Sequence, residues 1–312
     1  MPKNIIKLKK ISPDEIPADL RYETYFDFKR YPFEHQKLFT STTSVCDAIS
    51  QINNYANKWL KQAEENISTN CKIIKNKASS HTYTIGYFQL VITKEAICEP
   101  ARIIGSQVKN NRYSLIICKG ARLIGADIYL DEGSIFIGPN CIVEPGTVIK
   151  GPAIIGKHTE VRHGAYLRGN VILGDEVIIR GEVKNAVLMN NACFPHPCYV
   201  GDSLCGYKTH FGNQVTSANF NIFGGIQPKT HQNPIIIECE GKLYDTGLSK
   251  MGICMGDFSQ IGCHSVSDPG TFLKPYTIVY PMTRIKKGFY GPEVIIKSIP
   301  QYTQVPLEKF HK

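Results

Sequence analysis

The amino-acid sequence predicts an all-β protein, a left-handed parallel β-helix with an N-terminal arm and one amphipathic α-helix. The main observation is an aliphatic residue at every sixth position, with turn-forming residues in between. The unbroken series is Ile137, Val143, Ile149, Ile155, Val161, Leu167, Leu173 and Ile179. An α-helix repeats about every 3.6 residues and a strand about every 2, so neither explains this period. Six-residue units with turn formers are typical of a parallel β-helix, whose successive coils stack in register.

The same spacing resumes further along the chain, which sets the expected domain organisation. The later positions are Leu188, Phe194 and Val200, then, after a step that is one residue short, Cys205 and Phe211, and after a break Met255, Ile261, Ser267, Leu273, Val279 and Ile285. A break at about residues 220–250, with a β-like run at Ile235–Glu238, predicts a loop or hairpin that projects from the coil. We therefore expect an arm, a helix and short strands in residues 1–90, the β-helix in residues 91–290, and a tail in residues 291–312.

The segment before the β-helix has a different pattern. Residues 41–66 follow helical apolar spacing, and Ser44 with Asp47 resembles an N-terminal cap. Two interpretations of this helix stay open: it docks on the first coils, or it is a lid or partner-binding surface. Capping also has a physical motive, because an open β-helix end exposes strand edges and apolar core.

Composition and charge limit the class of protein. The chain has 312 residues, of which 42% are hydrophobic and 20% charged, and its formal net charge is +9, which suits anionic partners such as phosphates or coenzyme A. Lys/Arg runs with interleaved aromatics are missing, so we expect no nucleic-acid partner. No apolar run is long enough to span a membrane, and no signal peptide is evident. Eleven cysteines without a C-x-x-C pair predict a reducing, cytoplasmic location.

One part of the repeat carries side chains that a plain coil does not need. Lys184, His196 and Tyr199 gather there, and an imidazole has the intrinsic pKa to take a proton near neutral pH. His196 follows Lys184 by two six-residue units, so we expect both to project near related corners of the coil.

An ordered series of motifs in this region resembles one known family. The motifs are RHGAYLRGNVILGD (162–175), EVKNAVL (182–188), PHPCYVGDS (195–203), GYKTHFG (206–212), TSAN (216–219) and DTGLSKMGICMGD (245–257). They resemble the C-terminal hexapeptide-repeat domain of the bifunctional UDP-N-acetylglucosamine pyrophosphorylase/glucosamine-1-phosphate N-acetyltransferase. The resemblance implies a cytoplasmic homotrimer that transfers acetyl from acetyl-CoA to an amino-sugar phosphate in nucleotide sugar biosynthesis.

The resemblance also implies roles for single residues. His196 matches the general base, and Lys184 and Arg162, with Arg168 as a second candidate, match the sugar-phosphate ligands. Tyr199 and Asn219 match sugar-binding positions, and His210 stands where the family has a sugar-contacting Asn. Cys263 matches a coenzyme-contacting Ser, and Pro281 is the second residue assigned to the coenzyme. No metal is predicted at the acetyl-transfer site.

Other functions were weighed against this one. Residues 1–90 contain one glycine, Gly86, and are too short for a nucleotide-binding pyrophosphorylase half. A non-catalytic β-helix that scaffolds or regulates a nucleotidyltransferase stays open as the alternative. The spacing of His158 and His163 resembles the histidine pair of γ-class carbonic anhydrases, but a catalytic zinc needs a third ligand, and no histidine lies between His81 and His158.

Overall fold

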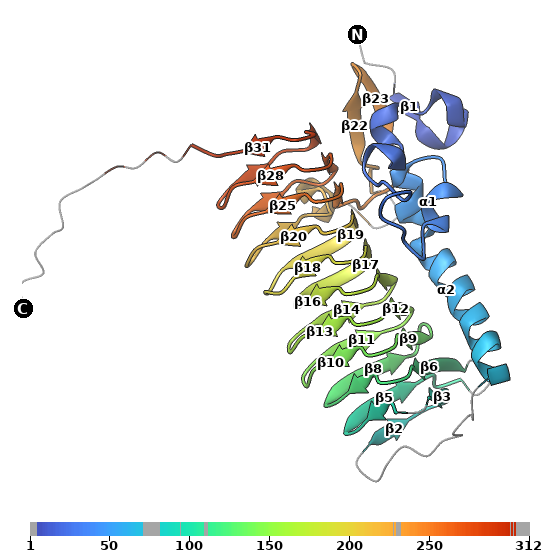
Figure 1. The fold of residues 1–312 in the computed structure, drawn as a ribbon. Helices are drawn as coiled ribbons and strands as arrows, with labels where there is room; N and C mark the ends of the chain where they lie inside the picture. The colour runs from blue at the N-terminus through green and yellow to red at the C-terminus, as the bar shows by residue number, and fades with distance from the viewer. Residues whose placement is uncertain are drawn as a thin grey trace, which may run out of the picture.

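The computed structural model describes residues 5–70, 82–93, 95–108, 112–226, 228, 232–299, 301 and 303. These residues form a long parallel β-helix with helix α2 (Val45–Asn70) lying along its flank (Figure 1). The predicted fold class is therefore confirmed. Half of the predicted C-terminal tail, residues 300, 302 and 304–312, lies outside the described residues.

The aliphatic series forms the core of the coil. Val143 pairs with Val161, and Ile149 with Leu167, in register on neighbouring coils. All four side chains are buried in one continuous apolar cluster. The predicted stacking of successive coils is thus confirmed, because each aliphatic residue points inward and meets its counterpart one coil away.

Each regular coil supplies one short strand to each of three faces, which we call A, B and C in the order that the chain visits them. Among the described residues, face A is a ten-stranded parallel sheet. Its strands are β4 (Ile97–Cys98), β7 (Arg122–Leu123), β10 (Ile142–Val143), β13 (Glu160–Val161), β16 (Ile178–Ile179), β18 (Cys193–Phe194), β20 (His210–Phe211), β25 (Gln260–Ile261), β28 (Ile278–Val279) and β31 (Ile295–Ile296).

Faces B and C are continuous, because β17 (Glu182–Leu188) and β19 (Tyr199–Cys205) run across the corner between them. The other strands of face B are β2 (Tyr83–Ile85), β5 (Ala101–Gly105), β8 (Ala126–Leu130), β11 (Val148–Lys150), β14 (Tyr166–Arg168), β21 (Thr216–Ser217), β26 (Val266–Ser267) and β29 (Arg284–Ile285). Those of face C are β3 (Phe88–Ile92), β6 (Tyr113–Ile117), β9 (Ile135–Ile137), β12 (Ala153–Ile155), β15 (Val171–Leu173), β24 (Ile253–Met255), β27 (Thr271–Leu273) and β30 (Gly288–Tyr290).

Helix α2 covers the outer side of face C. The Ser44 hydroxyl accepts a hydrogen bond from the Asp47 backbone N–H at 3.1 Å, as the capping pattern predicts. The apolar stripe of the helix joins the outward side chains of face C in a second buried cluster, which includes Ile52 and Ile172. The helix therefore docks on the β-helix, but along β12, β15, β17 and β19 and not at an open end of the coil.

The arm that precedes α2 consists of short turns packed on the corner between faces C and A. Its elements are η1 (Leu8–Lys10), η2 (Pro13–Glu15), η3 (Ala18–Leu20), η4 (Tyr22–Thr24) and α1 (Lys37–Thr40). Tyr31 stacks on Tyr207, with ring centroids 4.4 Å apart, and the Asp27 N–H donates to the Asp257 carboxylate at 2.9 Å. Burial raises the pKa of Asp257 to about 6.

The interruption of the repeat forms the predicted hairpin. Strands β22 (Ile236–Cys239) and β23 (Lys242–Asp245) pair antiparallel, after a short turn η5 (Ile222–Ile226). The arm adds a third strand, β1 (Ile5–Lys7), parallel to β23, which the sequence pattern did not reveal. Within the described part of the chain, none of the helices is both long and apolar enough to cross a membrane.

Candidate active site

The turns that lead from face A to face B form one edge of the coil, which we call the A–B corner. Its stacked turn residues on successive coils are His196, Asn213, Cys263 and Pro281. Backbone hydrogen bonds tie these turns together: Gln214 N–H to the Pro197 carbonyl at 2.7 Å, His264 N–H to the Asn213 carbonyl at 2.8 Å, and Met282 N–H to the Cys263 carbonyl at 2.9 Å. The fold thus aligns the residues that sequence reasoning assigned to the base and to the coenzyme.

Two histidines lie close together beside this corner. His196 is exposed in the turn between β18 and β19, and His210 is half-buried in β20 on face A. Burial lowers the pKa of His210, and the charge of His196 lowers it further, while a hydrogen bond with the Cys193 backbone raises it. His196, by contrast, is open to solvent.

On face B, Tyr199 and Asn219 come together over Gly201. A Cβ on Gly201 would lie 2.5 Å from Asn219 Nδ2 and 2.6 Å from the Tyr199 hydroxyl oxygen, so glycine lets both polar groups cover the backbone here. Burial and the Asp202 charge raise the pKa of Tyr199, and a hydrogen bond with Asn219 opposes that rise. The two residues form one polar patch.

The three candidate phosphate ligands are separated. Arg162 forms an ion pair with Glu160 at 2.9 Å. Burial raises the pKa of the Cys193 thiol on face A, and the charge of Arg162 lowers it. Arg168 pairs with Glu182 on face B. Lys184 lies opposite Gly201 in the register of β17 and β19, close to the Tyr199–Asn219 patch. Across the described ranges, Lys184 is the one of these three cations without an ion pair to a carboxylate.

The expectation that Lys184 and His196 share related corners is wrong. Lys184 lies within strand β17, whereas His196 lies in the turn that follows β18. The chain takes five residues from Val183 to Leu188 instead of six, because Asn185 alone makes the turn between faces B and C. Two six-residue units lead from face B through face C to face A, so Lys184 and His196 stand at different corners, and the short turn at Asn185 shifts the count by one more residue.

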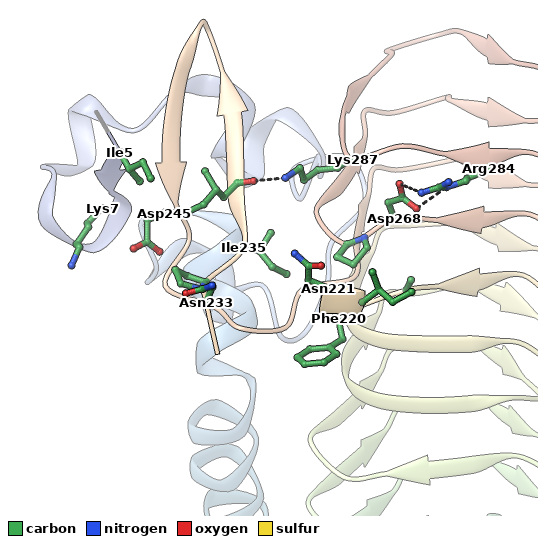
Figure 2. A pocket seen from close by; sticks show the side chains of 15 residues that line it. Ile5, Lys7, Phe220, Asn221, Asn233, Ile235, Asp245, Asp268, Arg284 and Lys287 are labelled. Carbon is green, nitrogen blue, oxygen red and sulfur yellow. Dashed lines mark hydrogen bonds and ion pairs between the residues drawn. The ribbon is translucent and has the colours of Figure 1, made fainter. Parts of the chain in front are cut away.

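A cavity of about 850 Å³ lies next to this patch, between the hairpin and the coil (Figure 2). It is lined by Ala218 and Phe220, which flank Asn219 in the chain. Two cationic side chains around the cavity already have hydrogen-bond partners. Arg284 donates two hydrogen bonds of 3.0 and 3.1 Å to Asp268, and Lys287 donates one of 2.9 Å to the Ile236 carbonyl. Sequence reasoning did not find this cavity, because it depends on how the insertion folds back.

The histidine pair considered for zinc is split by a strand. His158 lies in the turn before β13, with a φ of 56°, and His163 lies in the turn after it. The His163 Nδ1 atom is 2.6 Å from the Pro145 carbonyl oxygen. Within the described residues, no cluster of three or more His, Cys, Asp and Glu side chains is arranged to hold a metal ion.

Comparison with known proteins points in one direction. Residues 134–169 match the family model described as bacterial transferase hexapeptide (six repeats). The uncharacterized acetyltransferase YaiX of Escherichia coli (strain K12) is 26% identical over 187 residues, which cover 59% of this chain and 78% of YaiX.

Two bifunctional proteins are also similar, over a smaller part of their length. The sugar-1-phosphate nucleotidylyltransferase/acetyltransferase of Sulfurisphaera tokodaii is 30% identical over 159 residues, covering 45% of this chain and 38% of that protein. GlmU of Buchnera aphidicola is 24% identical over 210 residues, covering 59% of this chain and 40% of GlmU. The chain thus carries a hexapeptide-repeat domain and is similar to acetyltransferases.

Proposed function

We propose that the protein is an acetyltransferase that moves the acetyl group of acetyl-CoA to the amine of an amino-sugar phosphate. The supporting observation is the alignment of His196, Cys263 and Pro281 on one edge of the coil, next to the polar patch of Tyr199 and Asn219. A long thioester substrate could follow the edge, while a sugar binds over face B.

The chemistry requires a base. A sugar ammonium has no free electron pair, so only the neutral amine attacks the thioester, and His196 would take one of the amine's protons as its nitrogen bonds to the acetyl carbon. The carbon–sulfur bond then breaks, and coenzyme A leaves as the thiol after it gains a proton. Lys184 is the strongest candidate for the phosphate, because its charge is not neutralised by a carboxylate of the described chain.

The homotrimer is part of the proposal. Helix α2 covers face C, which leaves faces A and B and the corner between them for neighbouring subunits. A trimer would have three times the chain mass of 34.9 kDa, measurable by analytical ultracentrifugation.

Thiol release from acetyl-CoA in the presence of glucosamine-1-phosphate tests this function. We expect release by the wild type and a loss of about 10²- to 10⁴-fold in kcat for His196→Ala. Replacement of His163, which lies on the same edge of an earlier coil, serves as the matched control and should leave the rate unchanged. No release by the wild type at high enzyme concentration would favour the non-catalytic scaffold.

A further inference from the structure

The edge between faces B and C carries a column of asparagine and aspartate side chains, which we call the Asx ladder. Its members on successive coils are Asn170, Asn185, Asp202 and Asn219. The first three have left-handed φ values of 54°, 48° and 48°, a conformation that Asn and Asp tolerate better than other side chains. Turn geometry explains why these residue types recur, but it does not explain why one of them is charged.

Asp202 is the charged member, and it accepts hydrogen bonds from the side-chain amides of Asn185 and Asn219 on the two neighbouring coils. Its Oδ1 atom accepts from Asn185 Nδ2 at 2.8 Å, and its Oδ2 atom accepts from Asn219 Nδ2 at 2.6 Å, while the residue is only 7% exposed. An ionised carboxylate can only accept hydrogen bonds, so both amides must turn their NH₂ groups toward it. The carbonyl oxygen of Asn219 then points away from Asp202.

The orientation of the Asn219 amide also determines how the Tyr199 hydroxyl can form hydrogen bonds. The hydrogen bond between Asn219 and the Tyr199 hydroxyl lowers the pKa of Tyr199, against the effects of burial and of the Asp202 charge. The geometry gives the direction: a Cβ on Gly201 would touch both Asn219 Nδ2 and the Tyr199 hydroxyl oxygen, so the nitrogen of the amide is the atom that faces Tyr199. One N–H of that nitrogen goes to Asp202, which leaves the second N–H for the Tyr199 oxygen. The Tyr199 hydroxyl proton is left to be donated to a ligand.

We propose that Asp202 is a positioning residue that fixes the polarity of the sugar site, with Tyr199 as donor and Asn219 as acceptor. A neighbouring donor and acceptor suit a sugar hydroxyl, which can both accept and donate, whereas an ammonium group can only donate. The patch would therefore bind a hydroxyl of the acceptor and leave the amine free to approach His196. This inference rests on the proposed function, because it assigns a substrate group to the same site.

Asp202→Asn tests the role with little change in size or backbone preference. The new amide replaces an acceptor-only group, so Asn219 loses its fixed orientation. We expect the KM for the amino-sugar phosphate to rise about 10- to 100-fold, the KM for acetyl-CoA to stay unchanged and the Tm to stay near the wild-type value. Asn185→Gly is the matched control, since it removes the other partner of Asp202 and should leave both KM values unchanged.

A double-mutant cycle separates positioning from a general structural effect. If Asp202 acts through Asn219, Asp202→Asn should add nothing to the loss caused by Asn219→Ala. Additive losses, or a wild-type KM in a folded Asp202→Asn protein, would overturn the proposal and leave the acetyltransferase function intact.

Binding of N-acetylglucosamine-1-phosphate, measured by calorimetry, gives a readout that does not need catalysis. Weaker binding by Asp202→Asn supports the role of Asp202 even if the wild type releases no thiol, in which case the proposed function alone fails. If the wild type neither binds N-acetylglucosamine-1-phosphate nor releases thiol with glucosamine-1-phosphate, both proposals are overturned.

Discussion

The two histidines beside the A–B corner differ in exposure, and this difference separates their chemistry. His196 is exposed, whereas His210 is half-buried and its imidazolium form is disfavoured by burial and by the His196 charge. His210 therefore suits hydrogen bonding as a neutral imidazole, which can replace an asparagine amide as a partner for a sugar.

His196→Gln should raise the pKa of His210, because the repulsion between two positive imidazoles disappears. The NMR titration of the His210 ring proton measures this change directly. His163→Gln is the control, with an unchanged His210 titration expected. A His210 pKa that stays the same or falls in His196→Gln would show that the two rings are not close in solution.

Helix α2 is held to face C mainly by apolar contact. Ile52 is fully buried in the cluster that also contains Ile172 of β15. Burial of such side chains is the dominant favourable contribution to docking.

Ile52→Ala should lower the free energy of unfolding by about 2–5 kcal/mol, because a buried cavity replaces the lost methyl groups. Urea unfolding followed by circular dichroism measures it. Lys58→Ala, on the exposed side of the same helix, should change stability by less than about 0.5 kcal/mol. Equal effects of the two substitutions would mean that α2 is not docked as described.

The contact between the arm and α2 includes a buried titratable group, His35. Its Nδ1 atom lies 3.2 Å from the Tyr55 hydroxyl, and burial lowers the pKa of His35 from 6.5 to about 4. The unfolded chain binds a proton there below pH 6.5, but the folded chain does not until about pH 4. The contribution of His35 to the free energy of unfolding is therefore fully present above pH 6.5 and is lost as the pH falls from 6.5 to about 4.

The free energy of unfolding should fall by on the order of 3 kcal/mol over this pH range. His35→Gln should remove most of this dependence on pH. Asp257 has the opposite effect on stability over part of this pH range. Burial raises its pKa to about 6, so the folded chain binds a proton there before the unfolded chain does as the pH falls. The informative quantity is thus the difference between variant and wild type in urea stability at pH 7 and pH 5. Parallel pH profiles for both proteins would contradict a buried, neutral His35.

At the scale of the whole molecule, the sequence predicted the repeated coil and the local elements but missed the contacts between segments that are distant in the chain. Side chains such as Ile149 and Leu167 follow a local rule, so their burial and stacking could be read from spacing alone. The pairing of β1 with β23 joins residues 5–7 to residues 243–245, which are far apart in the chain, and no local pattern signals it.

In the candidate site, too, some residues could be predicted from the sequence and others could not. His196, Tyr199 and Asn219 carry motifs that could be recognised in sequence, and the coil explains why residues on successive turns meet. The position of Lys184 was misjudged because two six-residue units lead to a different face of the coil, and the coil is also one residue short at Asn185. Asp202 was overlooked because its importance depends on two hydrogen bonds to neighbouring coils.

The central claim is that the coil places a coenzyme path along the A–B corner beside a sugar site on face B. A crystal structure of the protein with coenzyme A and N-acetylglucosamine-1-phosphate tests it most directly. The account predicts coenzyme A along the edge of Cys263 and Pro281, with its sulfur near His196, and the sugar over Tyr199 and Asn219. Coenzyme A bound elsewhere, or a sugar far from both residues in a fully occupied crystal, would contradict it.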